Sequence, residues 1–151
     1  MHTHLSIVIP VYNEGSNILA ALSEINRCIR VPHEVLIVYD FDEDDTLPAV
    51  KQVLSESRNL RLVKNIYGRG VLNAIRTGFE SAQHDAILVV MADLSDQLSV
   101  VDGMFAQINE GYDIVCGSRY MSGGMQIGGP VFKKLLSRCA GLSLCCLLQF
   151  P

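Results

Sequence analysis

Short, continuously apolar runs recur along the chain, and they constrain its fold more than any other feature. They are rich in valine and isoleucine and lack the polar alternation of a half-exposed strand. Such runs predict strands that are buried on both faces, as in a largely parallel sheet. The five runs span residues 5–11, 35–39, 60–64, 86–92 and 113–117.

Amphipathic segments lie between the apolar runs and predict helices. Their apolar residues recur every three or four positions, which places them on one helix face. The predicted inner faces consist of Ile18, Leu22, Ile25 and Ile29 in the first helix, of Val50, Val53 and Leu54 in the second, and of Leu72, Ile75, Phe79 and Ala82 in the third. Thr46 is expected to cap the second helix, with Pro48 in its first turn. The alternation of strands and helices predicts an α/β sandwich with right-handed crossovers.

Length and charge narrow the class of protein. The 151 residues suit one compact domain with a substantial core. The net charge is −4, and no run of lysine and arginine forms the basic stripe that a nucleic-acid-binding surface requires. We therefore expect no nucleic-acid partner.

Targeting and cysteine patterns favour a cytoplasmic protein. The first four residues lack the basic and apolar regions of a signal peptide. The most apolar segment, 135–150, contains Arg138 and is shorter than a transmembrane helix. The five cysteines show no C-x-x-C spacing and are predicted to be buried thiols in a reducing compartment.

Acidic and amide side chains follow four of the predicted strands. In open α/β sheets, ligands bind at the carboxyl ends of the strands. The residues at these ends include Glu14, Asp40, Asp42, Asp44, Asp45, Asn65, Asp93 and Asp96. Carboxylates gathered at one edge repel each other unless a cation compensates, which predicts a Mg²⁺ or Mn²⁺ site. The alternative is that residues 40–45 only cap the second helix and that Asp93 only caps its own loop.

Other motifs carry less information. No G-x-G-x-x-G sequence follows the first strand, which argues against a dinucleotide-binding domain. Gly68-Arg69-Gly70 precedes the third helix, where the backbone can approach a ligand, so Arg69 is a candidate substrate-binding residue. A simple tight turn is the alternative interpretation. Ser95 and Ser118 have no convincing histidine partner, so a hydrolase triad is not indicated.

Three motifs together resemble the family 2 glycosyltransferases. They are LSIVIPVYNE at residues 5–14, Asp93-Leu94-Ser95-Asp96 after the fourth strand, and Gly117-Ser118-Arg119-Tyr120 after the fifth. The branch with the strongest resemblance contains the polyprenyl-phosphate glycosyltransferases, such as dolichyl-phosphate mannose and glucose synthases. The resemblance covers nearly the whole chain. It implies the GT-A fold, a Rossmann-like α/β/α sandwich with a mainly parallel central sheet.

The resemblance also implies a reaction. Family members transfer a sugar from a nucleotide diphosphate donor, such as a UDP- or GDP-sugar, to a polyprenyl phosphate, with inversion at the anomeric carbon. A metal neutralises the departing diphosphate. The acceptor phosphate has a second pKa near 6 and is largely an anion at pH 7, so positioning by cations matters more than a general base.

Site residues follow position by position from the resemblance. Pro10, Tyr12 and Glu14 would line the nucleoside pocket, and Asp40 would lie near base and ribose. Asp93 matches the second acid of a D-x-D motif, and Arg119 and Lys133 match basic positions that face the acceptor phosphate. The candidate substrate-binding residues are Pro10, Tyr12, Asn13, Glu14, Asp40, Asp42 and Arg69, the catalytic ones Asp93, Arg119 and Lys133, and the metal ligands Asp93 and Ser95.

The chain departs from the family pattern at two motifs. Met91 replaces the first acid of the D-x-D motif, so Asp40, Asp42, Ser95 or Asp96 are alternative sources of metal ligands. The usual D-D-G-S after the second strand is replaced by Tyr39-Asp40-Phe41-Asp42.

Family members continue beyond the length of this chain. Residues 1–151 are therefore expected to form the N-terminal portion of the catalytic domain, without its C-terminal elements. The alternative is a non-catalytic nucleotide-binding or assembly module. The segment 133–148 is expected to form a helix, either against the cytoplasmic face of a membrane or in a core. Exposed sheet edges would favour a homo-oligomer.

Overall fold

The computed structural model describes residues 1–118. The chain divides into two compact units, Met1–Val115 and Cys116–Pro151, and the helices and strands of the described residues all belong to the first. Arg119, Lys133 and the helix predicted at 133–148 lie outside the described residues.

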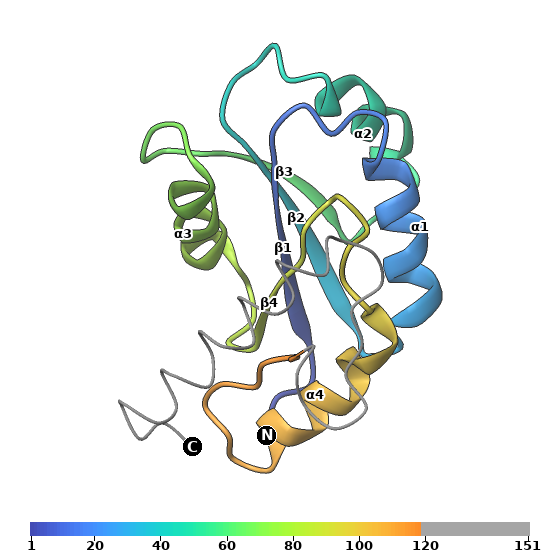
Figure 1. Cartoon of the computed structure of the whole chain (residues 1–151), viewed down its shortest axis with the longest axis vertical. Coiled ribbons are helices and arrows are strands. Elements are labelled where there is room, and N and C mark those ends of the chain that lie inside the picture. The colour runs from blue at the N-terminus through green and yellow to red at the C-terminus, as the bar shows by residue number, and fades with distance from the viewer. Residues whose placement is uncertain (119–151) are drawn as a thin grey trace, which may run out of the picture. The chain divides into compact units, whose positions relative to one another are not determined.

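A parallel sheet of four strands forms the centre of the first unit (Figure 1). The strands are β1 (Leu5–Val11), β2 (His33–Tyr39), β3 (Leu60–Lys64) and β4 (Ile87–Val89), in the order β3-β2-β1-β4. Every pair is parallel, which confirms the predicted sheet. All seven residues of β1 are buried, as expected for an inner strand that is covered on both faces.

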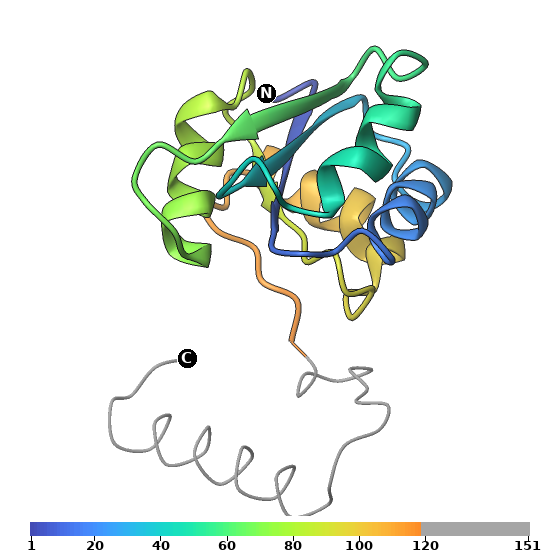
Figure 2. The same cartoon turned by 90° about the horizontal axis from the view of Figure 1, so that it is seen from above.

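Helices cover both faces of the sheet (Figures 1 and 2). The helices are α1 (Ile18–Cys28), α2 (Thr46–Leu54), α3 (Val71–Ser81) and α4 (Val101–Asn109), with a 3₁₀ turn at Leu98–Val100. Ile7 and Ile9 of β1 belong to the core under α1, α2 and α4, whereas Val8 belongs to a second core with Ala74 of α3. Alternate residues of one strand point to opposite faces, so β1 supplies both cores of a three-layer α/β/α sandwich.

The predicted inner faces are correct for two helices and wrong for the third. All four predicted residues of α1 are buried, and Val50 of α2 is buried with Val53 and Leu54 packed beside it. In α3 the buried residues are instead Ala74, Thr77 and Gly78. Of the predicted residues, Leu72 is 78% and Phe79 48% exposed, and Ile75 and Ala82 are half-buried. The reason is close packing. A Cβ atom on Gly78 would lie 2.3 Å from Cγ1 of Val8, so only small residues fit between α3 and β1.

Two predicted strands also differ from the structure. The run 86–92 forms a strand only at Ile87–Val89. The backbone N–H of Val90 still donates to the carbonyl of Val8, but that of Met91 donates to the Asp96 carboxylate, which turns the chain into a loop. The run 113–117 forms no strand, and Ile114 is 80% exposed. An apolar run becomes a strand only when a neighbouring strand pairs with it.

Cysteine burial differs from the prediction as well. Cys28 and Cys116 are free thiols, but Cys28 is half-buried and Cys116 is exposed. The prediction of buried thiols is therefore wrong for these two. Cys28 lies at the end of α1, where its thiol donates to the Glu24 carboxylate at 3.2 Å. Within residues 1–118, no helix has both the length and the hydropathy needed to cross a bilayer.

Candidate functional site

A cavity of about 350 Å³ opens at the carboxyl edge of the sheet. It collects the last residues of β1, residues that follow β1, β2, β3 and β4, and the first turn of α3. Its lining consists of Pro10, Val11, Tyr12, Glu14, Asp40, Arg69, Gly70, Val71, Ala74 and Met91. The structure thus brings together five of the predicted substrate-binding residues, namely Pro10, Tyr12, Glu14, Asp40 and Arg69.

The loop after β1 is fastened to the start of α2. Asp44 is 1% exposed, and its carboxylate accepts the backbone N–H groups of Asn13 at 3.2 Å and Thr46 at 2.8 Å. The hydroxyl of Thr46 accepts the N–H of Glu14 at 2.9 Å. Thr46 is therefore the first residue of α2 and not its cap, because its hydroxyl is used by the neighbouring loop. Pro48 lies in the first turn, as predicted.

Asp40 holds the loop between β3 and α3. Its carboxylate accepts the Asn65 side-chain amide at 2.7 Å and the Gly70 N–H at 2.9 Å. Asn65 is 9% exposed and also donates to the carbonyl of Gly68 at 2.7 Å, while its amide oxygen accepts the hydroxyl of Thr77. These bonds fix the backbone on both sides of Arg69, so this wall of the cavity is formed before any ligand binds.

Aromatic rings and a guanidinium form the rim of the cavity. The rings of Tyr12 and Phe41 meet edge to face with centroids 5.6 Å apart, and Tyr12 remains 62% exposed. The Cζ atom of Arg69 lies 4.7 Å from the centroid of the Phe41 ring. Each of these three residues comes from a different loop, so the rim exists only in the folded chain.

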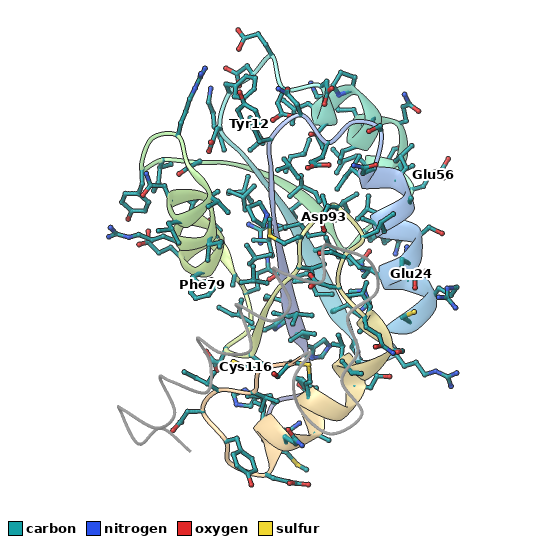
Figure 3. All side chains as sticks on the ribbon, in the orientation of Figure 1. Tyr12, Glu24, Glu56, Phe79, Asp93 and Cys116 are labelled. Atoms are coloured by element: carbon teal, nitrogen blue, oxygen red, sulfur yellow. The ribbon has the colours of Figure 1, made fainter. Side chains whose placement is uncertain are left out.

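Asp93 lies in the loop after β4 and is exposed (Figure 3). Hydrogen bonds from Ser95, through its side chain and its backbone N–H, lower the pKa of the Asp93 carboxyl. Asp93 is therefore ionised at neutral pH. Between Asp93 and Ser95, Leu94 has a φ of 60°, a backbone conformation that costs energy for a leucine and is often found at functional loops.

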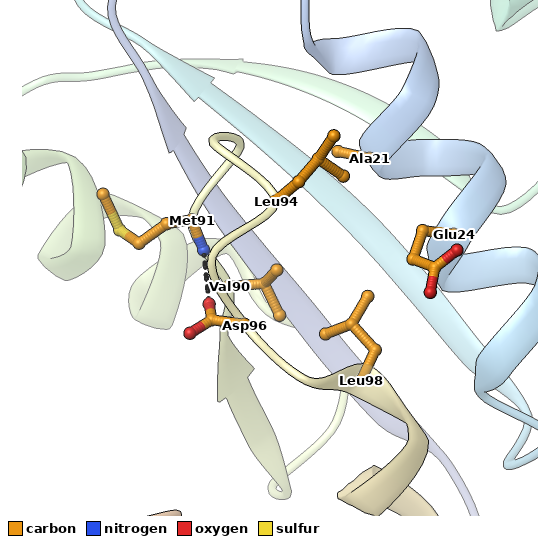
Figure 4. A pocket seen from close by; sticks show the side chains of 7 residues that line it. All are labelled: Ala21, Glu24, Val90, Met91, Leu94, Asp96 and Leu98. Atoms are coloured by element: carbon orange, nitrogen blue, oxygen red, sulfur yellow. Dashed lines mark hydrogen bonds between the residues drawn. The ribbon is translucent and has the colours of Figure 1, made fainter. Parts of the chain in front are cut away.

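A smaller cavity of about 240 Å³ lies beneath the loop that carries Asp93 (Figure 4). Ala21 and Glu24 of α1 form one side of it, and Leu94 and Leu98 form the other. Met91 lines both cavities, so the loop after β4 borders each of them.

Other predicted site residues lie outside the larger cavity. Asp42 is exposed and pairs with Lys64 at 2.5 Å, which raises the pKa of the lysine. Asn13 has a φ of 54°, and its backbone N–H donates to Asp44. Ser95 bonds to Asp93 instead of lining the cavity. Arg119 and Lys133 lie outside residues 1–118, which are the residues that the structure describes.

The residues present fit a divalent cation that is shared with a ligand's phosphates. In residues 1–118, no three His, Cys, Asp or Glu side chains gather closely enough to hold a metal ion by themselves. Mg²⁺ in phosphate-binding sites is usually held by one or two carboxylates together with phosphate oxygens. The exposed, ionised carboxylate of Asp93 is a suitable ligand of that kind.

Comparison with known proteins gives consistent matches. The sequence profile of the family described as Glycosyl transferase family 2 matches residues 6–133. Over 136 residues the chain is 31% identical to a dolichol-phosphate mannosyltransferase of Pyrococcus furiosus, a match that covers 90% of this chain and 39% of that protein. Over 117 residues it is 30% identical to an undecaprenyl-phosphate 4-deoxy-4-formamido-L-arabinose transferase of Pseudomonas savastanoi, covering 74% of this chain and 34% of that protein.

A solved structure shows the same architecture. A mannosyltransferase from Pyrobaculum calidifontis, in complex with GDP-Man and Mn²⁺, superimposes with a TM-score of 0.53 at 27% sequence identity. The match covers 61% of this chain and 28% of that one. This chain thus spans less than half the length of each of these three proteins.

Proposed function

Because this chain belongs to glycosyl transferase family 2 and has its GT-A fold, we propose that it binds a nucleotide diphosphate sugar for transfer to a polyprenyl phosphate. The observation that carries the proposal is the larger cavity, where the carboxyl ends of β1, β2 and β3 bring Pro10, Tyr12, Glu14, Asp40 and Arg69 together. The relatives named for dolichol-phosphate and undecaprenyl-phosphate substrates support the choice of acceptor. The structure solved with GDP-Man and Mn²⁺ supports the choice of donor and of a divalent cation.

Each group in the site has a role in this proposal. The nucleoside lies between Tyr12 and the loop that Asp40 fastens, and the diphosphate extends towards Asp93. Asp93 would hold Mg²⁺ or Mn²⁺, which supplies positive charge for the departing diphosphate. The acceptor phosphate attacks the anomeric carbon from the opposite side, so the configuration inverts. Since that phosphate is already anionic at pH 7, the protein mainly needs to position it.

Metal-dependent nucleotide binding tests the donor site. Isothermal titration calorimetry with UDP, GDP and their sugars, in Mn²⁺, Mg²⁺ or EDTA, is expected to show binding that the metal strengthens. Asp93→Asn removes the ligand charge and is expected to weaken binding in Mn²⁺ about tenfold while changing binding in EDTA less than twofold. Asp85→Asn is the matched control, because Asp85 is an exposed acid that precedes β4 at the amino end of the sheet, the end opposite the cavity. Absence of binding for all four ligands would contradict the proposal.

In this proposal, Arg119 and Lys133 bind the phosphate of the polyprenyl acceptor. In a form of the protein that transfers sugar, Arg119→Ala and Lys133→Ala are each expected to reduce the transfer rate tenfold or more, since a charge-assisted contact contributes about 1.5–3 kcal/mol. Donor affinity should stay nearly unchanged, because both side chains would meet the lipid phosphate. The measurement is transfer of radiolabelled sugar into polyprenyl phosphate at saturating donor. Weak donor binding with normal transfer at saturation would refute the assignment.

A non-catalytic nucleotide-binding or assembly module is the second candidate. The observation that favours it is Met91, a cavity-lining residue that stands where the D-x-D motif has its first acid. Both candidates predict nucleotide binding. Binding without any sugar transfer to polyprenyl phosphate would favour the module, and labelled lipid product would favour the enzyme. Whether the protein associates with itself or with a membrane surface can be measured in the same preparations by light scattering and vesicle sedimentation.

A further inference from the structure

Asp96 closes the base of the loop that carries Asp93. The backbone N–H of Val90 donates to the carbonyl of Val8 at 3.0 Å and so continues the pairing of β4 with β1. The next N–H, that of Met91, donates to the Asp96 carboxylate at 3.1 Å (Figure 4). Successive N–H groups of a strand point to opposite sides, so the Met91 donor faces away from β1. Within residues 1–118, β4 is an edge of the sheet, and Asp96 supplies the acceptor that a further strand would provide there.

The tip of the same loop contains a tight turn with a strained residue. The Asp93 carboxylate accepts the backbone N–H of Ser95 at 3.0 Å. Between these two residues, Leu94 has a φ of 60°, which a leucine keeps only when the surrounding structure imposes it. The bond within the turn does not connect the tip to the sheet. The bond from Met91 to Asp96 joins the two ends of the loop and thereby fixes the direction in which the tip leaves the sheet.

Packing beneath the loop gives it little support. The smaller cavity, of about 240 Å³, lies between the loop and α1, with Leu94 on one side and Ala21 on the other (Figure 4). Leu94 is also 49% exposed. A side chain that borders both a cavity and solvent makes few van der Waals contacts, and segments with few contacts open at a low cost in free energy. The position of Asp93 therefore depends on the hydrogen bond at the base of the loop.

We propose that Asp96 is a positioning residue, which holds the loop so that the Asp93 carboxylate is preorganised for the divalent cation. The inference rests on the proposed function, in which Asp93 holds the metal beside the donor diphosphate. Without the bond to Met91, the loop would become ordered only on binding, and the cost of that ordering would weaken the affinity. Asp96 thus acts through the backbone of the loop and is not a metal ligand, the alternative that its place in the sequence leaves open.

Two variants of Asp96 separate positioning from metal binding. Asp96→Ala removes the acceptor, whereas the amide oxygen of Asp96→Asn still accepts the Met91 N–H but lacks the charge of a metal-binding carboxylate. In the metal-free chain, hydrogen exchange at the amides of residues 91–96 is expected to be about fivefold faster in Asp96→Ala and to change less than about twofold in Asp96→Asn. By calorimetry with UDP and GDP in Mn²⁺, Asp96→Ala should weaken binding about fivefold and Asp96→Asn less than about twofold. In EDTA, neither variant should change binding more than about twofold.

Asp102→Ala is the matched control. The Asp102 carboxylate also accepts backbone N–H groups, those of Arg30 at 3.1 Å and Val31 at 3.3 Å, but it lies in α4 and lines neither cavity. This variant should leave both the exchange of residues 91–96 and the metal-dependent binding unchanged.

Two results would overturn the inference. Equal weakening by Asp96→Asn and Asp96→Ala in Mn²⁺, with unchanged hydrogen exchange, would identify Asp96 as a metal ligand. Unchanged exchange and unchanged binding in Asp96→Ala would show that the loop is held without it. If the unaltered chain shows no binding that the metal strengthens, the proposed function fails, and hydrogen exchange of the metal-free chain still decides whether Asp96 holds the loop.

Discussion

Replacing Glu34 by alanine is expected to lower the free energy of unfolding by about 3 kcal/mol. Glu34 lies in β2 and is only 5% exposed. Its carboxylate accepts the Ser6 hydroxyl at 2.6 Å and the Gln83 N–H at 2.6 Å, and it pairs with Arg61 at 2.9 Å. At the amino end of the sheet, alanine would leave the Ser6 hydroxyl and the Gln83 N–H without their acceptor, and Arg61 would keep only the Ser81 carbonyl. Urea denaturation at pH 7 measures the difference.

The contribution of Glu34 to the free energy of unfolding should depend on pH. Burial alone raises the pKa of its carboxyl, but the hydrogen bonds from Ser6, Gln83 and Arg61 together lower the pKa below its ordinary value of 4.5. The folded state therefore favours the ionised form. The stabilisation is complete above the ordinary pKa and is lost as the pH falls through the lower pKa of the folded protein. The stability difference between the unaltered chain and Glu34→Ala should accordingly shrink on acidification below pH 4.5.

Glu24→Ala is the matched control for this prediction. Glu24 also pairs with an arginine, Arg27 at 2.5 Å, but this pair is far more exposed, since the side chains of Arg27 and Glu24 are 69% and 34% exposed. Exposed ion pairs add little to stability, so the midpoint of unfolding should hardly move. A similar loss in Glu24→Ala and Glu34→Ala would show that burial of the carboxylate is not the cause.

Hydrophobic periodicity predicted the layers of the fold because large apolar residues fill the space beneath most elements. Ile18 and Ile25 of α1 are fully buried over the sheet, as their spacing indicated. The same reasoning failed for α3, since hydrophobicity carries no information about how closely a helix approaches a strand. There the small residues Ala74 and Gly78 face the sheet, and the large residue Leu72 faces outward.

The sequence predicted those residues of the candidate site that lie at the carboxyl ends of strands. Pro10 is the last residue but one of β1, and Tyr12 and Asp40 directly follow β1 and β2. The carboxyl ends of parallel strands share one edge, so the proximity of these residues could be inferred from the sequence. The contacts of Phe41 could not be inferred in this way. One apolar residue between two acids in a loop has no periodicity, and its contacts with Tyr12 and Arg69 arise only where three loops meet. Asn65 was visible as a strand-end residue, but its hydrogen bonds to Asp40 after β2 and to Thr77 of α3 were not.

The close approach of α3 to β1 makes Gly78 the position in the helix with the least room for a side chain. Gly78→Ala is expected to lower the free energy of unfolding by about 2 kcal/mol. An alanine Cβ would lie 2.3 Å from Cγ1 and 3.0 Å from Cγ2 of Val8, which is fully buried and cannot move aside. The loss should appear even though alanine favours a helix over glycine by about 1 kcal/mol. Thermal and urea unfolding both measure it.

Gly103→Ala separates the effect of packing from that of helix propensity. Gly103 lies inside α4, and a Cβ built there meets no atom of residues 1–118 within 4 Å. The same substitution should therefore raise the free energy of unfolding, by up to about 1 kcal/mol. A loss at Gly103 as large as at Gly78 would mean that steric overlap with Val8 does not explain the result.

A double-mutant cycle with Val8 tests the contact itself. Val8→Ala removes both methyl groups that the new Cβ would strike, and by itself it destabilises the second core, to which Val8 belongs with Ala74. In the double variant the alanine at position 78 takes part of the space that Val8 vacated. The double variant should thus be more stable than the sum of the single losses predicts, by about 1 kcal/mol. Strict additivity would show that α3 can shift away from the sheet, because a helix free to move would relieve the overlap without any change in Val8.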